Sequence, residues 1–567
     1  MMRRLVVGIG ALVVSAGAIA ASSPPGVADA AAAAPQMADA HAEATLANLI
    51  QHGQRDAALQ RLAAGADPNV AQADGTTALH WAAYSVDSGL VKALLAHGAR
   101  ADVRNRFGST PLAEAVKVAD VASVRMLLNA GADVESANQD GQTALMLAAH
   151  TGVVKVAELL VKHGANVNAR ERWRGQTALM WAAAEDRPGM TQFLVAHGAK
   201  VNTRAFINEW PTQVTSEPRA QYRPTAGLTP LLYATRSGCM GCVQALLKAG
   251  ADINKPDPDG ITPLISAIDN FNFDTARYLL EKGANPGTWD WWGRTPLYVA
   301  VDMNSYRPRF EEPKEHPDKT TAMDIVHMLL AAGVSPNPQL DMLRPGRGGN
   351  SGRFVDALLT TGTTPLLRAA ISDDTEAIEV LLKAGALVDL PNAMGVTPLM
   401  ASAGMGVRGG PGVTVPDTRG NYAGDVQSRA IKSLQVLLEA GADINARVCD
   451  TAGHTARIAR PSTMTDRQGE TALYGSISWG WTRVVQFLLA NGARADLVDV
   501  TGATPLDAAT KGHAGERNFK VVPEIAELLK KADSARRASA GSARGAVPTA
   551  SLQPPRQTRT ADSGPSR

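Results

Sequence analysis

This sequence of 567 residues has few aromatic residues, few cysteines and almost no excess of either charge. Its 56 basic and 54 acidic residues leave a net charge of +2, which argues against an extended nucleic-acid footprint. Three cysteines are too few for a disulfide framework. Hydrophobic residues make up 45% of the chain, with 52 glycines and 33 prolines. That balance excludes a disordered polyelectrolyte and favours short helices of small residues separated by many turns.

The first residues have the features of a secretory signal. Arg3 and Arg4 precede an uncharged apolar run over residues 5–20, and small residues offer cleavage near Ala20/Ala21. We therefore expect residues 1–21 to be a signal peptide and the protein to be periplasmic or secreted. An uncleaved membrane anchor is the alternative, although the run is short for a spanning helix. No later segment reaches transmembrane length.

The segments that flank the middle of the chain have linker-like compositions. Residues 22–42 are rich in Ala and Pro and predict a linker. Residues 533–567 are rich in Ser, Ala, Pro and Arg, with almost no large apolar side chain. Such a composition cannot repay the entropy of ordering, so we expect a disordered tail.

One pattern dominates the middle of the chain, with a period of mostly 33 residues. A glycine is followed two residues later by Thr-Pro-Leu or Thr-Ala-Leu. About twenty residues further on comes Leu-Leu-x-x-Gly-Ala-x-x-Asn or a close variant, as at residues 246–254. The first element recurs at Gly75, Gly108, Gly141, Gly175, Gly227, Gly260, Gly293, Gly362, Gly395, Gly469 and Gly502.

Each part of the pattern has a physical role in a pair of helices. The Thr is placed to cap the first helix, and the Pro after it occupies a position where its missing N–H costs nothing. The following Leu and Ala residues make a thin apolar face, and the Leu-Leu pair is the buried stripe of a second helix. The next Gly ends that helix, and Asp or Asn shapes a protruding turn. One such unit has no closed core and must stack on its neighbours.

The pattern resembles the ankyrin repeat family, most clearly from Asp140-Gly141-Gln142-Thr143-Ala144-Leu145 to Gly164-Ala165-Asn166-Val167-Asn168. The resemblance implies an all-α, ankyrin-type helical solenoid of stacked helix-turn-helix units with protruding β-turn loops. We place the array at residues 43–532, with an N-terminal capping unit at 43–72. Repeats are expected to start at about 73, 106, 139, 173, 225, 258, 291, 360, 393, 467 and 500. Insertions at about 203–225, 302–321, 336–361, 404–427, 448–467 and 512–520 interrupt it.

The family resemblance also implies where a partner would bind. Ankyrin proteins usually bind partners through the turn tips and the exposed face of the first helices, which line a concave groove. Aromatic side chains at these positions would be costly unless covered and make good anchors, unless the insertions fold over them. The candidates are Tyr84, Phe107, Trp173, Trp289, Trp291, Trp292 and Trp479. Trp81 and Trp181 replace a Leu and are expected in the core.

The pair Cys239 and Cys242 leaves two alternatives open. A C-x-x-C at a helix start in an oxidising compartment can close a local disulfide. Otherwise Cys242 is a core thiol and Cys239 a half-exposed one. Val243 stands where a c-type haem site needs His, and there is no second C-x-x-C for zinc. Cys449 is left unpaired.

The sequence contains no motif from which we predict catalytic residues, a metal site or a cofactor. The match to G-x-G-x-x-G at residues 404–409 follows an expected ankyrin helix rather than a strand, so it does not indicate a dinucleotide site. His97, His163 and His197 each precede a helix-ending Gly, which favours capping over metal binding.

These observations predict a non-catalytic protein–protein interaction scaffold that is exported and monomeric. Its partner would be another protein of unknown identity and not a nucleic acid. Two alternatives remain: an envelope-associated structural protein anchored by its basic tail, and a thiol-active accessory of an exported redox enzyme that uses Cys239 and Cys242.

Overall fold

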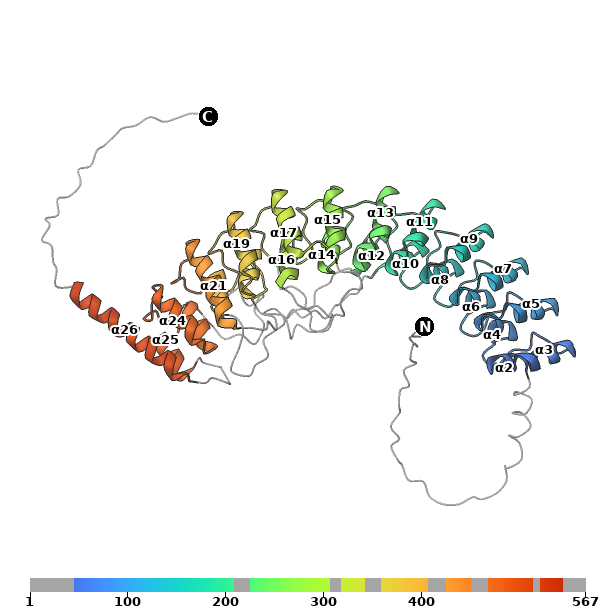
Figure 1. Cartoon of the computed structure of the whole chain (residues 1–567), viewed down its shortest axis with the longest axis horizontal. Coiled ribbons are helices and arrows are strands. Elements are labelled where there is room, and N and C mark those ends of the chain that lie inside the picture. The colour runs from blue at the N-terminus through green and yellow to red at the C-terminus, as the bar shows by residue number, and fades with distance from the viewer. Residues whose placement is uncertain are drawn as a thin grey trace, which may run out of the picture.

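The chain folds into a curved stack of helix pairs (Figure 1). The computed structural model describes residues 45–208, 225–305, 318–341, 358–405, 425–449, 468–512 and 521–543. Within these ranges each pair has a first helix on the inner side of the curve and a second helix on the outer side (Figure 1). The predicted fold, an all-α helical solenoid, is confirmed.

The helices alternate along the chain as the repeat pattern requires. The first helices are α2 (Leu46–Gln51), α4 (Ala78–Tyr84), α6 (Pro111–Lys117), α8 (Ala144–Thr151), α10 (Ala178–Ala184), α12 (Pro230–Ser237), α14 (Pro263–Asp269), α16 (Pro296–Ser305), α18 (Pro365–Ile371), α20 (Pro398–Ser402), α23 (Ala472–Ser478) and α25 (Pro505–Lys511). The second helices are α3 (Arg55–Ala63), α5 (Ser88–Ala96), α7 (Val121–Asn129), α9 (Val154–Lys162), α11 (Pro188–Ala196), α13 (Met240–Lys248), α15 (Phe273–Glu281), α17 (Ala322–Ala331), α19 (Thr375–Lys383), α21 (Val426–Glu439), α24 (Thr482–Ala490) and α26 (Pro523–Ala543).

The threonine of each Thr-Pro-Leu or Thr-Ala-Leu begins a first helix as its N-cap. Thr110 Oγ1 accepts a hydrogen bond from Ala113 N at 3.2 Å, and Thr364 Oγ1 accepts one from Leu367 N at 3.1 Å. Such caps contribute about 1 kcal/mol each because they satisfy a backbone donor that has no partner inside the helix. Short helices are marginal alone, so packing between repeats supplies the remaining stability.

Asparagine side chains tie consecutive repeats together on the outer side. Asn69 Nδ2 donates to Gly98 O at 3.0 Å, and Asn69 Oδ1 accepts from Arg100 N at 2.9 Å. Asn168 and Asn202 make the same pair of bonds to the repeats that follow them. The last residue of the Gly-Ala-x-x-Asn signature is therefore an inter-repeat bridge that holds neighbouring helix ends in register.

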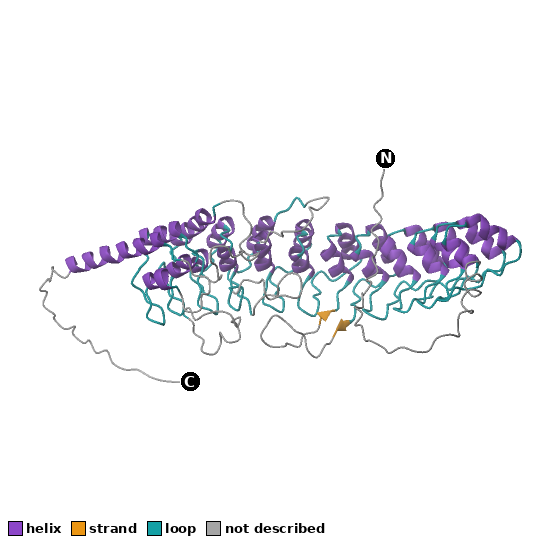
Figure 2. Cartoon of the chain, turned by 90° about the horizontal axis from the view of Figure 1, so that it is seen from below, coloured by secondary structure: helices purple, strands orange, loops and turns teal. Residues whose placement is uncertain are grey.

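The turn tips form a second connection, on the side where the loops project (Figure 2). Backbone N–H groups of one turn donate to carbonyls of the turn before it, as from Arg106 N to Asp74 O at 2.7 Å. Two short antiparallel strands, β1 (Ile207–Asn208) and β2 (Thr225–Ala226), pair at the base of the first insertion, with Ile207 opposite Ala226. These contacts make the row of tips a continuous surface.

The C-terminal boundary of the array differs from the expectation. Helix α26 continues to Ala543, so the prediction of disorder from residue 533 is wrong for residues 533–543. The segment holds four Ala and two Arg, which favour helix, and an i,i+4 ion pair joins Arg537 to Asp533 at 2.7 Å. Arg536 also pairs with Asp496 of the preceding repeat unit. A compositional argument for disorder missed these contacts.

Several predicted segments lie outside the described residues. They are the signal peptide and linker, the tail from residue 544, and the central parts of all six insertions. Within the described ranges, no helix has both the length and the apolar character needed to cross a membrane.

Candidate protein-binding surface

The inner face of the solenoid has an open half and a covered half. On the N-terminal side, α4 presents a half-buried Trp81 and an exposed Tyr84, and α12 presents Arg236. Further along, every residue of α18 and of α20 is buried. The open groove therefore comprises the inner helices α4, α6, α8, α10 and α12. Sequence periodicity had predicted no such difference between repeats.

The structure places most of the candidate aromatic residues at exposed positions. Trp173 is 78% exposed, and Phe107 and Trp289 are each 67% exposed, all at turn tips. Tyr84 and Trp291 are also exposed. Large apolar rings at such positions are available for contact with another molecule.

Trp292 and Trp479 do not have the expected exposure. Trp292 is only 6% exposed. The Arg294 guanidinium lies 5.3 Å from the centre of its ring, and this buried arginine pairs with Asp290 at 2.7 Å. Trp479 is half-buried because it stacks on Trp481 at 5.6 Å. Both rings therefore belong mainly to the stack, and we remove them from the candidate binding surface.

Trp81 and Trp181 differ from expectation in the opposite direction. Both pack against the core but are only half-buried, so each ring keeps a solvent-exposed part. Trp81 Nε1 donates to Gln72 Oε1 at 2.8 Å. Trp181 packs edge-on against His150 at 5.7 Å, and its buried Nε1 has no hydrogen-bond partner among the described residues. These rings extend the aromatic surface into the groove.

A hollow of about 430 Å³ opens between α10 and α12, beside the tip that carries Trp173. Gln176 Nε2 donates to the Tyr233 hydroxyl at 2.6 Å across it, and burial raises the pKa of Tyr233. The phenol therefore stays neutral and keeps its proton for donation. The hollow is lined by Arg174, Gln176, Trp181, Ala184, Glu185, Tyr233, Arg236 and Ser237.

Comparison with protein families explains the architecture of this surface. A model of ankyrin repeats in three copies matches residues 46–138, 122–205, 213–290 and 231–307, and a model of one ankyrin repeat matches residues 361–393. The chain belongs to the ankyrin repeat family. Ankyrin repeats generally mediate protein–protein interaction, and proteins built from them are typically non-enzymatic scaffolds.

Among solved structures, the ankyrin chain is similar to the human ASB11 ankyrin repeat domain, with 22% identity and a TM-score of 0.36. The similarity covers 43% of this chain and 99% of that domain. A search of curated proteins finds no match.

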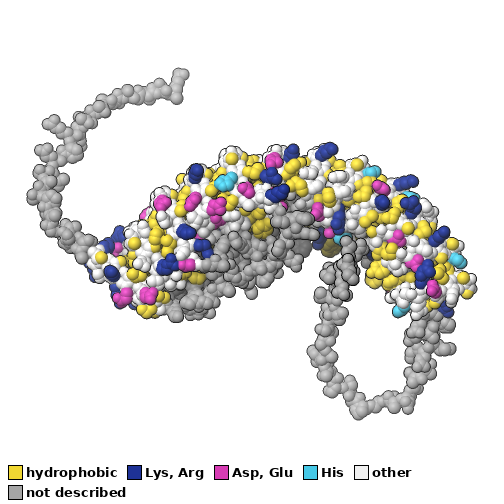
Figure 3. All heavy atoms as spheres, viewed as in Figure 1, with side chains coloured by type: hydrophobic (Ala, Val, Ile, Leu, Met, Phe, Trp, Pro, Cys, Tyr) yellow, Lys and Arg dark blue, Asp and Glu magenta, His cyan; other side chains and the backbone are white. Residues whose placement is uncertain are grey.

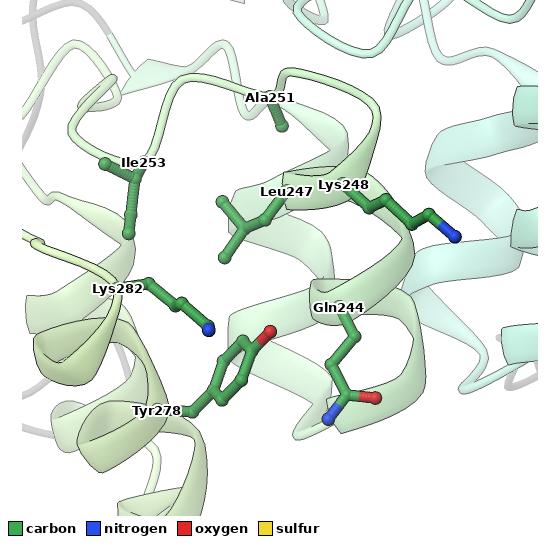
Figure 4. A pocket seen from close by; sticks show the side chains of 7 residues that line it. All are labelled: Gln244, Leu247, Lys248, Ala251, Ile253, Tyr278 and Lys282. Carbon is green, nitrogen blue, oxygen red and sulfur yellow. The ribbon is translucent and has the colours of Figure 1, made fainter.

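A second hollow lies on the outer face of the ankyrin stack, between α13 and α15 (Figure 4). It measures about 620 Å³, and Lys282 Nζ lies 5.4 Å from the centre of the Tyr278 ring. The lining offers two lysines and a tyrosine but no carboxylate, imidazole or thiol. Its lining is Gln244, Leu247, Lys248, Ala251, Ile253, Tyr278 and Lys282.

Cys239 and Cys242 form a disulfide at the start of α13. Both are at most 1% exposed, which corrects the alternative that made Cys239 half-exposed. Cys239 is the N-cap residue, with its Sγ accepting from Cys242 N at 3.1 Å, and Thr191 Oγ1 donates to Cys242 Sγ at 3.4 Å. Asp186 lies close to both sulfurs, but bonded sulfurs offer no thiolate to a metal. Cys449 is free and exposed.

The recurrent histidines have the expected capping contact. His97, His163 and His197 each end a second helix, and each ring Nδ1 lies 2.8 Å from the carbonyl oxygen four residues earlier. A ring nitrogen that donates to this carbonyl satisfies one of the free acceptors at the helix end. The capping prediction is confirmed.

Some surface residues were missed by the sequence analysis. Phe206 and Ile207 are exposed beside the first insertion, and Tyr233 lines the hollow.

Proposed function

We propose that this chain is a non-catalytic scaffold that binds another protein in the open groove and along the adjoining turn tips. The observation that carries the proposal is the set of exposed tip aromatics beside a groove lined by further half-buried rings. Binding sites commonly depend on a few such anchors. A stacked solenoid holds them in fixed positions, so little conformational entropy is lost on association.

The proposal is tested by affinity capture of partners with the full chain. A double variant, Phe107→Ala and Trp173→Ala, removes two tip rings that contact little of the stack, so the fold should be retained. We expect the captured partner to be lost or reduced about tenfold. The matched control is Leu387→Ala with Val521→Ala, two exposed apolar residues away from the groove. If both variants capture the same amount of the partner protein, the binding site does not include Phe107 and Trp173.

Export and a monomeric state belong to the same proposal. The support for export is the charged start and apolar run of residues 1–21. N-terminal sequencing of the protein recovered from the producing cell should find a new start near Ala20/Ala21. Retention of Met1 on a membrane-associated product would indicate an uncleaved anchor instead. Sedimentation equilibrium of the processed protein should give the monomer mass.

A further inference from the structure

Six of the arginines in the turns that connect the repeats from α5 to α12 lie near the projecting tips, in three of these four turns. We call them the basic strip, and they are of two kinds, according to whether the guanidinium group bonds to the next turn. Arg104 is of the first kind and Arg106 of the second, and both lie in the turn that carries Phe107. The strip consists of Arg104, Arg106, Arg170, Arg172, Arg174 and Arg204.

The first kind of arginine connects one turn to the next through backbone carbonyls. Arg104 Nη1 donates to Ala137 O at 2.8 Å, Arg170 Nη2 to Arg204 O at 2.6 Å, and Arg204 Nη2 to Pro256 O at 2.7 Å. A carbonyl carries no net charge, so these bonds fix the guanidinium groups without neutralising them. Two of the three also have a carboxylate near: Arg104 lies 3.8 Å from Asp133, and the charge of Arg204 opposes the rise that burial causes in the pKa of Asp257.

The second kind of arginine is not tied to a neighbouring turn. Arg106, Arg172 and Arg174 are exposed and make no side-chain hydrogen bond or ion pair with the described part of the chain. The nearest acid in sequence, Glu171, is 3% exposed and accepts from the backbone N–H groups of Trp173, Arg174 and Gln176. It shapes the longer turn rather than pairing with the strip. Basic side chains therefore outnumber acidic ones in the three arginine-bearing turns, whereas the turn between the first two carries the exposed acids Asp133, Glu135 and Asp140. Over the face shown in Figure 3, basic and acidic side chains are interspersed.

Aromatic rings alternate with these charges. Phe107 and Trp173 follow Arg106 and Arg172 directly, and Phe206 lies under the Arg170 guanidinium at 4.5 Å. Arg174 also lines the hollow between α10 and α12, so the strip is continuous with the groove.

We propose that the basic strip binds an acidic, extended segment of the partner protein. Its carboxylates would pair with Arg106, Arg172 and Arg174, whose planar forks match carboxylate geometry. An apolar or aromatic side chain of the segment would fill the hollow beside Trp181 and Tyr233. This inference rests on the proposed function and adds the chemistry of the partner. The chain's small net charge favours a protein segment over a nucleic acid.

The test begins with the full chain as bait for a library of random peptides of about twelve residues. We expect the selected peptides to be rich in Asp and Glu, with an aromatic residue among them. A selected peptide, labelled with fluorescein, should lose affinity about tenfold or more when Arg106, Arg172 and Arg174 are all changed to Glu. Its binding should also weaken as salt rises from about 0.05 to about 0.5 M.

A matched control makes the same change of charge in the same part of the stack. Lys92→Glu, Arg125→Glu and Lys155→Glu lie on the outer helices α5, α7 and α9, at exposed positions. We expect this variant to bind the peptide within about twofold of the wild type. Circular dichroism establishes that both variants fold, and a milder triple change of the strip to Gln should give an intermediate affinity.

The possible failures are distinguishable. Selected peptides without acidic bias, or acidic peptides that bind the strip variant normally, would overturn this inference but leave the scaffold proposal standing. Tighter binding of a single-stranded oligonucleotide than of the acidic peptide would overturn it in favour of a nucleic-acid surface. If no peptide is selected, and the Phe107→Ala, Trp173→Ala variant captures the partner as well as the wild type does, both proposals are overturned.

Discussion

At the scale of single residues, His80 shows how one side chain can join two repeats. It is buried, and its Nδ1 accepts from Thr77 N at 3.2 Å, which assigns the proton to Nε2. Nε2 in turn donates to Ser109 O of the next repeat at 3.1 Å. Burial lowers the pKa of this imidazole, so the folded state requires it neutral.

The folded protein should consequently become less stable in mild acid. In the unfolded chain His80 takes up a proton near its ordinary value of about 6.5, whereas in the fold it resists protonation. The stabilisation from the neutral ring is complete above that pH and is lost as the pH falls below it. The variant His80→Met introduces the residue that other repeats have at the equivalent position, for example Met146 and Met180. Its Tm should fall less steeply than that of the wild type between about pH 7 and pH 5.

The control for this prediction is His97→Asn, which changes an exposed helix cap. Its Tm should keep the pH dependence of the wild type. Parallel Tm curves for wild type and His80→Met would show that His80 does not titrate as the buried contacts require.

At the scale of elements, α26 shows how neighbouring contacts extend a helix beyond its apolar core. Leu529 is 1% exposed and anchors the start of the helix, whereas the turns around Arg536 and Arg537 are exposed. The ion pairs of Arg536 with Asp496 and of Arg537 with Asp533 stabilise these turns, which are not held by buried apolar side chains. The end of α26 should therefore open without unfolding of the array.

A proline in this exposed part tests that independence. Ala535→Pro should break the last turns of α26, because it removes a backbone donor and clashes with the preceding turn, at a cost of about 3 kcal/mol. Trypsin should then cleave after Arg536 or Arg537 faster than in the wild type, while the Tm of the array stays the same. The substitution Ala535→Ser is the control. Equal cleavage in all three proteins would mean that α26 is not helical there in solution.

At the scale of the whole molecule, the free energy of unfolding is a sum of the contributions of single repeats and of the interfaces between adjacent repeats. Each helix packs mainly against its partner in the pair and against the corresponding helices of adjacent repeats, such as α10 between α8 and α12. The core is continuous along the stack, and in the described part of the chain the main helix contacts all lie within a repeat or between adjacent repeats. Damage in one repeat should therefore remain local.

This locality predicts the pattern of hydrogen exchange after a core substitution. Leu246→Ala empties a fully buried site in α13 and should cost about 2–5 kcal/mol. Amide exchange measured by mass spectrometry should accelerate in α11 to α15 and remain unchanged in α4 and α6. The exposed substitution Leu387→Ala should leave exchange as in the wild type. Uniform acceleration along the chain would contradict a nearest-neighbour solenoid.

The sequence by itself determined the helix pairs, because their signals are local. A threonine cap, a proline after it and a terminal glycine act within a few residues of their own backbone, and a 33-residue period repeats them. Only the tertiary structure decided which rings face solvent. Phe107 and Trp292 both precede a repeat glycine, yet one is exposed and the other is buried beside Arg294. Arg294 also pairs at 3.4 Å with Asp269 of the preceding repeat. This difference, like that between the open and covered halves of the groove, therefore involves side chains brought together across repeats, which no local pattern encodes.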